Sequence, residues 1–289
     1  MILVTGATGK VGSELVRRLS ERRAGFRALV RSAGKAAAIR EAGGEAVVGD
    51  LADPAALKTA LKGVEKLFLL TNSLPDQPET EARIVDAAKS AGVTRVVKLS
   101  TSGADALEPP LFLKLHRDAE RHIEGSGLEW TFLRPSFFMQ NYLDFADAIR
   151  AQRVLASPAG TGRHADVDAR DVGEVAARVL TESGHEGRAY ELTGREAYSF
   201  DDVARRIGTI SGREVRFVDL SPEEGRRALI TAGESEWSAD AWVELLAWFQ
   251  EGEGSTNGSV VSLGVEEVLD RPPRPLDAFL REHIRAFGE

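Results

Sequence analysis

The chain has 289 residues, of which 43% are hydrophobic and 28% are charged, a balance that predicts a folded globular protein rather than a disordered one. Its formal net charge of −8 argues against a protein that binds the phosphate backbone of nucleic acids, because such binding depends on basic patches. The sequence contains no cysteine, which excludes disulfides, thiolate catalysis and cysteine-ligated metals, and suits a reducing cytoplasm.

Short apolar runs alternate with amphipathic segments through the first half of the chain. Continuous runs of Val, Leu and Phe suit strands that are buried on both faces of a parallel sheet. They predict strands at 2–4, 26–30, 45–48, 66–70, 95–99 and 130–133. Helices are predicted between them at 11–22, 55–61, 79–91 and 116–124. Strands that alternate with helices in this way predict right-handed crossovers and a doubly wound parallel sheet.

The second half follows a different pattern. A helix at 172–180 and a strand at 189–192 are expected to return to the same sheet. Helices are also predicted at 137–150, 199–210, 222–232, 239–250 and 276–287, with a Gly/Ser/Glu loop at 252–259. We therefore expect an α/β protein with two parts. Residues 1–135 and about 165–195 form a dinucleotide-binding (Rossmann) domain, and residues 136–164 and about 196–289 form a smaller, mainly helical, substrate-binding lobe.

Three glycines with the spacing Gly-x-x-Gly-x-x-Gly follow the first strand and open the first helix. Such glycines let the chain turn tightly, let the backbone approach a pyrophosphate and let the helix pack closely on the strand. The start of the helix also presents free N–H groups and the positive end of its dipole to the phosphates. We predict that this turn binds a dinucleotide through Gly6, Thr8, Gly9, Lys10, Val11 and Gly12.

The end of the second strand indicates which dinucleotide is bound. Sites that prefer NAD place an acidic residue there to hold the ribose 2′-hydroxyl, but this strand ends in Arg31 and no acid follows before Glu41. Arg31, with Lys35 in support, predicts a site for the 2′-phosphate of NADP(H). At the end of the third strand, beside Leu51, Asp50 either accepts from the adenine amine or caps the helix near Pro54.

Polar residues follow three further strands at the edge where doubly wound folds bind their ligands. Thr71, Asn72 and Ser73 are expected to border the cofactor. Ser100, Thr101 and Ser102 end the fifth strand, and we expect a hydroxyl there to contact nicotinamide or substrate unless these residues only cap the strand. This set of expected contacts is Thr71, Asn72, Ser73, Ser100, Thr101 and Ser102.

Several segments of the chain resemble the NmrA-like branch of the atypical short-chain dehydrogenases. They are the opening MILVTGATGKVG, Arg31, Gly49-Asp50-Leu51, LEWTFLRP at 128–135, FMQNY at 138–142 and GHEGRAY at 184–190. Within that branch, the chain is most similar to bacterial NAD(P)H:quinone oxidoreductases and triphenylmethane-dye reductases. The resemblance covers nearly the whole chain. It implies a Rossmann fold, NADP(H) as cofactor and a backbone at Pro135 that passes near the nicotinamide.

The family comparison also exposes a departure from ordinary short-chain dehydrogenases. Those enzymes use Tyr-x-x-x-Lys, in which the tyrosine transfers a proton and the lysine holds the ribose. Here Phe112 stands at the tyrosine position and His116 at the lysine position. Alcohol/ketone chemistry through a tyrosine is therefore not expected, which suits the NmrA-like branch. His116 either holds the nicotinamide ribose or donates a proton, and we name it with Ser100 as a candidate catalytic residue; the alternative is an exposed helix histidine.

Aromatic residues cluster in two places that are candidates for an acceptor pocket. The predicted pocket residues are Ser102, Phe137, Phe138, Met139 and Tyr142. Such a density of rings is also typical of a plain core. Trp237, Trp242, Trp248 and Phe249 are assigned to packing within the lobe or to a subunit interface.

The acidic segment before residue 172 offers little for metal binding. His164, Asp166 and Asp168 are ligand types, but nothing else completes a site, so no metal is expected. We assign Asp166, Asp168 and Asp171 to helix capping and ion pairs.

The leading prediction is an NADPH-dependent reductase that transfers hydride directly to a small aromatic or quinone-like acceptor. The alternative is a non-catalytic, NADP(H)-binding redox sensor that acts through a protein partner, as the missing tyrosine also permits. A nucleotide-sugar epimerase is a weaker third reading. We see no targeting segment and no apolar run of the ~20 residues that span a membrane, so we expect a cytoplasmic protein without membrane or nucleic-acid partners. The sequence leaves monomer and homodimer open.

Overall fold

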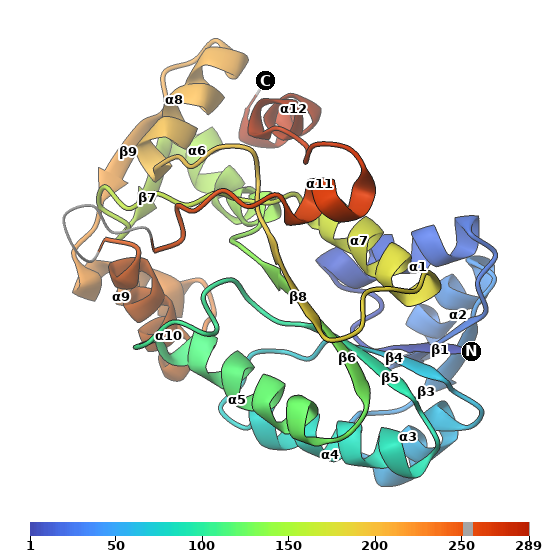
Figure 1. The fold of residues 1–289 in the computed structure, drawn as a ribbon. Coiled ribbons are helices and arrows are strands. Elements are labelled where there is room, and N and C mark those ends of the chain that lie inside the picture. The colour runs from blue at the N-terminus through green and yellow to red at the C-terminus, as the bar shows by residue number, and fades with distance from the viewer. Residues whose placement is uncertain (251–256, 289) are drawn as a thin grey trace.

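The computed structural model describes residues 1–250 and 257–288. Its main sheet has seven parallel strands in the order β3-β2-β1-β4-β5-β6-β8 (Figure 1). The strands are β1 (Ile2–Val4), β2 (Phe26–Val30), β3 (Glu45–Val48), β4 (Lys66–Leu69), β5 (Arg95–Leu99), β6 (Glu129–Pro135) and β8 (Arg188–Leu192). The strand order reverses at β1, because β2 and β3 follow on one side of it and β4, β5 and β6 on the other. Doubly wound folds bind their ligands at the carboxyl ends of the strands at such a reversal.

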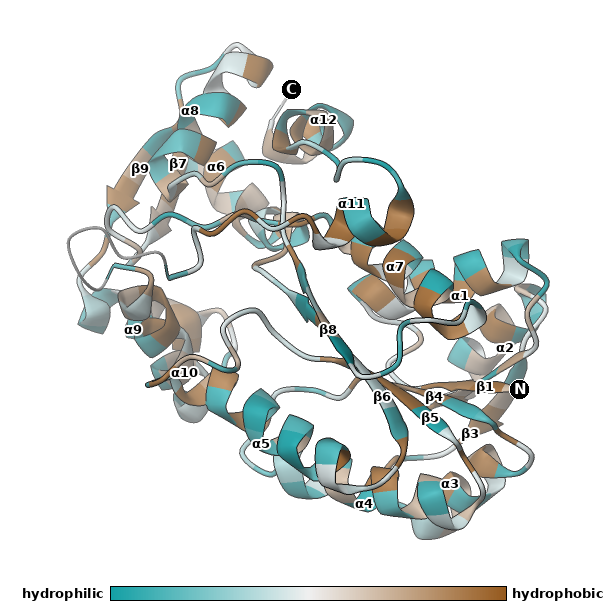
Figure 2. Ribbon diagram, viewed as in Figure 1, coloured by the Kyte–Doolittle hydropathy of each residue, from teal (hydrophilic) through white to brown (hydrophobic). Residues whose placement is uncertain are grey.

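The strands predicted from apolar runs are confirmed; the central ones are buried on both faces, whereas the edge strand β3 is exposed or half-buried along its length. Every residue of β1 and of β5 is buried, and the central positions of β4 and β6 are buried as well. In Figure 2, β1 is coloured as hydrophobic, whereas α4 and α5 on the outside alternate between hydrophobic and hydrophilic residues. Each large aliphatic side chain that leaves water in this way contributes about 1.5–3 kcal/mol to folding.

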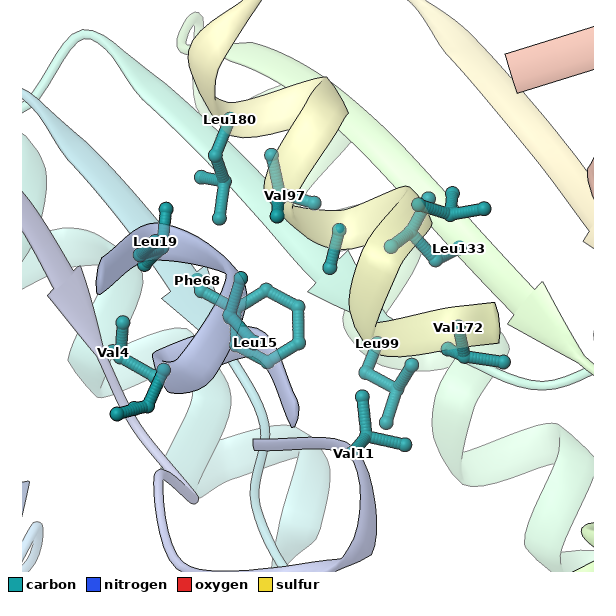
Figure 3. Close-up of a cluster of buried hydrophobic side chains, with 14 of the residues drawn as sticks. Val4, Val11, Leu15, Leu19, Phe68, Val97, Leu99, Leu133, Val172 and Leu180 are labelled. Atoms are coloured by element: carbon teal, nitrogen blue, oxygen red, sulfur yellow. The ribbon is translucent and has the colours of Figure 1, made fainter. Parts of the chain in front are cut away.

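Helices cover both faces of the sheet. One face carries α1 (Lys10–Glu21), α2 (Ala33–Glu41), α7 (Ala169–Thr181) and α11 (Gly264–Leu269), and the other carries α3 (Pro54–Leu61), α4 (Gln77–Ser90) and α5 (Leu111–Gly125). Figure 3 shows the first layer, in which Leu15 of α1 and Val172 of α7 lie over Phe68, Val97 and Leu133 of the strands. The sheet is therefore sandwiched, as the expected doubly wound fold requires.

The remaining described elements gather at one end of the sheet (Figure 1). They are η1 (Met139–Phe145), α6 (Ala146–Gln152), β7 (Val154–Ser157), α8 (Phe200–Ser211), β9 (Arg216–Asp219), α9 (Pro222–Thr231), α10 (Glu236–Trp248), α12 (Leu276–Glu282) and η2 (Ile284–Phe287). Their apolar side chains form a second core around Tyr142, Phe200 and Phe279. We call this group of elements the lobe.

The structure corrects several sequence expectations. The lobe is not wholly helical, because β7 and β9 form a two-stranded parallel sheet. In place of the single helix expected at 137–150, residues 139–145 form a 3₁₀ helix and residues 146–152 form an α-helix. Helix α5 begins at Leu111 rather than at 116. Helices α2 and α11 were not predicted, and most of the loop expected at 252–259 lies outside the described residues.

The ends of helices explain why the predicted boundaries held elsewhere. Asp53 accepts from the Ala55 N–H at 2.9 Å and caps α3, and Pro54 occupies the first turn of the helix, where its missing N–H costs nothing. Ser199 and Asp202 form a reciprocal capping box at α8. Such short-range signals fix where a helix begins independently of the tertiary structure. No helix within residues 1–250 and 257–288 combines the length and the hydropathy that are needed to cross a membrane.

We expect Gly12→Ala to destabilise the fold. A Cβ atom at Gly12 would overlap the Gly6 carbonyl oxygen and the Ala7 Cα, both of which belong to backbone that cannot move aside easily. Overpacking of this kind costs about 1–3 kcal/mol. Urea unfolding measures the change. Gly125→Ala is the matched control, because nothing lies within 4 Å of its added Cβ, and it should be neutral or stabilising by up to about 1 kcal/mol. Equal stability of both variants would contradict the close approach.

Candidate functional site

The turn between β1 and α1 has the geometry that an anion requires. Gly6 adopts a φ of +64°, and the Gly9 N–H donates to its carbonyl oxygen at 3.0 Å. Thr5 Oγ1 bonds the backbone of Phe68 and Leu70, which ties the turn to the end of β4. Gly9 is the N-cap of α1, and no side chain caps this helix. Its first-turn N–H groups and its positive dipole end are therefore left for a ligand such as a diphosphate.

Two cationic side chains stand beyond β2. Arg31 and Lys35 are exposed, and neither side chain makes a hydrogen bond or ion pair with the residues that the structure describes. Asp50 accepts from the Ala52 N–H at 2.8 Å and so stabilises its own turn, whereas the cap of α3 is Asp53. Leu51 packs against the core beneath α3. The strand end thus presents two unengaged cations, as expected for a 2′-phosphate site.

A cavity of about 770 Å³ lies between the carboxyl ends of the strands and the lobe. Residues expected at the strand ends line it, namely Pro135 and the polar Thr71, Ser73, Ser100, Thr101 and Ser102. Asn72 is exposed and does not line it. The Thr71 hydroxyl donates to Glu81 at 2.7 Å, but the buried Ser100 Oγ has no partner among the described residues. A buried hydroxyl in this condition is costly unless a ligand serves it.

His116 also lines the cavity, and a buried network fixes its ring. Lys98 and Glu81 form an ion pair at 2.5 Å whose side chains are 0% and 1% exposed. The Gln77 Nε2 donates to Glu81 at 3.1 Å and faces His116 Nδ1 at 3.4 Å. Because an amide nitrogen can only donate, His116 Nδ1 accepts and the ring proton sits on Nε2.

The same surroundings keep His116 neutral. Burial lowers the pKa of its imidazole well below the ordinary value, and the charge of Lys98 lowers it further. At neutral pH the ring is therefore a hydrogen-bond donor through Nε2–H rather than an imidazolium acid. Of the two roles expected from the sequence, the geometry suits the holding of an oxygen better than the release of a proton.

Aromatic rings form much of the remaining wall. Phe137 contacts the rings of Trp242 at 6.1 Å and His164 at 5.4 Å, and Phe112 meets Trp242 at 5.2 Å. Phe138, Trp248 and Phe249 line the cavity as well. The sequence assigned the aromatic residues of α10 and its C-cap to lobe packing or to a subunit interface. Three of them pack together with α5 and also line the cavity: Trp242, Trp248 and Phe249. Such rings suit a flat, conjugated ligand.

Two residues expected in the pocket do not line it. Met139 is 1% exposed and Tyr142 is 0% exposed, and both lie in the core of the lobe. The 3₁₀ helix η1 turns them away from the cavity, while Phe137 and Phe138 precede it and stay at the cavity. The aromatic run at 137–142 is therefore divided between wall and core.

A charged patch in the cavity wall was not foreseen. Arg134 on β6 donates to Glu120 at 2.8 and 2.9 Å and to Glu191 of β8 at 3.3 Å. Burial raises the pKa of Glu191. The lone arginine directly after the predicted apolar strand 130–133 was the available signal, because a buried arginine needs acidic partners.

Comparison with known proteins agrees with this geometry. The model of a family described as NAD(P)H-binding matches residues 6–183, which include the glycine turn. The chain belongs to this NAD(P)H-binding family.

Several relatives of this NAD(P)H-binding protein are reductases. It is 39% identical to an NAD(P)H azoreductase of Xenophilus azovorans, over 100% of this chain and 99% of the relative. The NADPH-dependent quinone oxidoreductase of Escherichia coli, solved with NADPH, is 30% identical, with a TM-score of 0.87 over 99% of both chains. A triphenylmethane reductase of Citrobacter sp., solved with NADP(H), is 26% identical, with a TM-score of 0.86 over 98% and 99% of the two chains.

The neutral state of His116 predicts an acid-sensitive contribution to stability. Its folded pKa lies well below the value of about 6.5 expected in the unfolded chain, so only the unfolded chain takes up this proton as the pH falls. The stabilising contribution is complete above pH 6.5 and is lost below it, by up to about 1.4 kcal/mol per pH unit.

Urea unfolding between pH 7 and pH 5 tests this expectation. His116→Gln should lose stability less steeply than the wild type, whereas His122→Gln, which removes a more exposed histidine of the same helix, should keep the drop. Parallel curves for the wild type and His116→Gln would contradict the buried neutral ring.

Proposed function

We propose that this protein is an NADPH-dependent oxidoreductase that transfers a hydride to a small aromatic or quinone-like acceptor. The observation that carries the proposal is the aromatic-walled cavity of about 770 Å³ at the strand ends of an NAD(P)H-binding fold. The names of the relatives support it, since azo compounds, quinones and triphenylmethane dyes are all conjugated acceptors of electrons.

The chain would hold the cofactor along the carboxyl ends of the strands. The glycine turn from Gly6 to Gly12 binds the diphosphate through its backbone, and Arg31 with Lys35 binds the 2′-phosphate. Ser100 and Pro135 lie where the strand ends meet the cavity and are assigned to the nicotinamide end. Bound NADPH supplies the hydride.

The protein's own contribution is to position the acceptor and to exclude water. Phe137, Trp242 and Phe249 enclose a flat ring system, and an apolar enclosure strengthens every polar contact within it. His116 donates its Nε2–H to an oxygen that gains electron density. Phe112 has no proton to transfer and packs instead against Trp237 at 5.5 Å and Trp242 at 5.2 Å. Hydride transfer to an electron-poor acceptor needs no tyrosine at that position.

The same proposal extends to the setting of the enzyme. We place it in the cytoplasm, without a nucleic-acid partner, because the chain is acidic and has no cysteine. Residues 1–135 and about 165–195 serve the cofactor, while residues 136–164 and about 196–289 complete the acceptor site. Helix α11 packs on α7 and β8 and so belongs with the first group by its contacts.

Arg31→Ala should weaken NADPH binding by roughly 10- to 100-fold and change NADH binding little, because a charged hydrogen bond to the 2′-phosphate contributes about 1.5–3 kcal/mol. Calorimetric titration with both nucleotides measures the two affinities. Arg40→Ala is the matched control, since it removes an exposed arginine from the end of α2. Equal losses for both nucleotides would refute the specificity assignment.

The reaction itself is tested by NADPH oxidation in the presence of a panel of quinones, azo dyes and cationic triphenylmethane dyes. We expect turnover well above the rate without protein. A protein that binds NADPH yet oxidises none of it with any acceptor would contradict the proposed enzyme. Such a result would favour a regulatory role through a protein partner.

A further inference from the structure

The buried Ser100 hydroxyl, which has no partner among the described residues, is one sign that the cavity takes a ligand, and the charged patch in the cavity wall indicates which kind. Arg134 donates to Glu120 at 2.8 and 2.9 Å. It also donates to Asp105 at 2.6 Å and to Glu191 at 3.3 Å. One guanidinium therefore faces three carboxylates, and the patch is more negative than positive.

The excess negative charge lies on the two carboxylates that face the cavity. Glu120 is 0% exposed and is also paired with Arg117, which Glu124 shares. In this network two arginines meet four carboxylates, so two negative charges have no positive counterpart. The side chains of Asp105 and Glu191 are 58% and 36% exposed, and both residues line the cavity.

The rest of the described wall adds no positive charge to offset them. Besides two histidines, Arg134 is the only basic residue among the described residues that line the cavity, and its charge is matched by Glu120. His116 is neutral, because burial lowers the pKa of its imidazole. Much of the remaining surface is aromatic, with Phe137 and Trp242 in contact. Carboxylates and the faces of aromatic rings both attract a cation, most readily a flat one with delocalised charge.

The shortage of proton donors favours the same kind of acceptor. A conjugated cation is reduced by a hydride alone: a C–H bond forms at its electron-poor carbon, the product is neutral, and the positive charge passes to the nicotinamide. A quinone takes up a proton as well before it becomes a hydroquinone. Phe112 has no proton to give, and the pKa of His116 lies well below its ordinary value, so neither residue is an acid at neutral pH.

We propose that Asp105 and Glu191 determine the specificity of the acceptor site and select a conjugated cation, such as a triaryl carbenium or an iminium ion, over neutral and anionic acceptors. This proposal rests on the proposed function, because it names the charge of that acceptor. The positive charge stays in the site throughout hydride transfer, first on the acceptor and then on the nicotinamide. The two carboxylates therefore stabilise the bound cation and the transition state alike, and they lower KM with little effect on kcat.

A double substitution removes both charges without disturbing the buried arginine. Asp105→Asn combined with Glu191→Gln keeps side chains of nearly the same shape, each with an oxygen that can still accept a hydrogen bond. Arg134 keeps its two bonds to Glu120, so no buried charge is left without a partner. The double variant is therefore expected to fold as the wild type does.

The matched control removes the same number of negative charges away from the cavity. It combines Asp118→Asn with Glu129→Gln, and neither residue is among the described residues that line the cavity. Asp118 pairs with Arg121 on α5, and Glu129 pairs with Arg95 at the start of β6. Arg95 keeps its second partner, Glu186, in this control.

Steady-state kinetics test the assignment with a cationic triphenylmethane dye, the same dye core carrying two sulfonate groups, and a neutral para-quinone. For the cation we expect the double variant to raise KM at least about fivefold, with kcat within about twofold of the wild type. KM for the quinone should stay within about twofold, and KM for the sulfonated dye should fall. The control should match the wild type with all three. An unchanged KM for the cation, or an equal rise with the quinone, would overturn the proposal and leave the proposed function intact.

Direct binding separates the failure of this proposal from the failure of the proposed function. If the wild type oxidises no NADPH with any acceptor, the proposed function fails, and the cationic dye can then be titrated into the NADPH-saturated protein without being consumed. A Kd at least about fivefold weaker for the double variant than for the wild type and the control would support the role of the two carboxylates. Equal Kd values, or no saturable binding of the dye by the wild type, would contradict it.

Discussion

The close packing of Gly12 against Gly6 is the constraint on which the rest of the structure depends. It brings the start of α1 onto the end of β1, so that the first-turn amides of the helix face the strand ends without a capping side chain. The Thr5 hydroxyl holds the same turn to β4. Everything downstream is arranged around that edge of the sheet, because β4, β5 and β6 deliver their terminal residues to the same side.

The cavity reflects a division of work between the sheet and the lobe. The strand ends supply small polar groups such as Ser100, while the lobe supplies Trp242 and Phe249 as apolar walls. Two histidines line the cavity. His116 faces Gln77, which is bonded to the buried Lys98–Glu81 ion pair. Gln77 Nε2 faces His116 Nδ1 at 3.4 Å, and the Asp166 carboxylate binds His164 Nδ1. The protein thus supplies polar side chains and an apolar wall, and the cofactor supplies the redox chemistry.

Much of this could be predicted from local sequence. The strands were found because burial on both faces leaves continuous apolar runs, and the glycine turn because its backbone permits few other residues. The prediction was less successful where tertiary contacts decide. Phe137 and Tyr142 lie close in sequence, yet only the position of η1 sends one to the cavity and the other to the core. Asp166 could not be paired with Tyr142 from sequence, because the two are joined only when η1 packs beside the segment before α7.

The central claim is that backbone amides at the start of α1 grip the cofactor diphosphate. Amide chemical shifts of a ¹⁵N-labelled, deuterated sample, recorded during titration with NADPH, test it most directly. The account predicts that the amides of Gly9, Lys10, Val11 and Gly12 are among the most strongly shifted. Saturable NADPH binding with those four amides unmoved would contradict it.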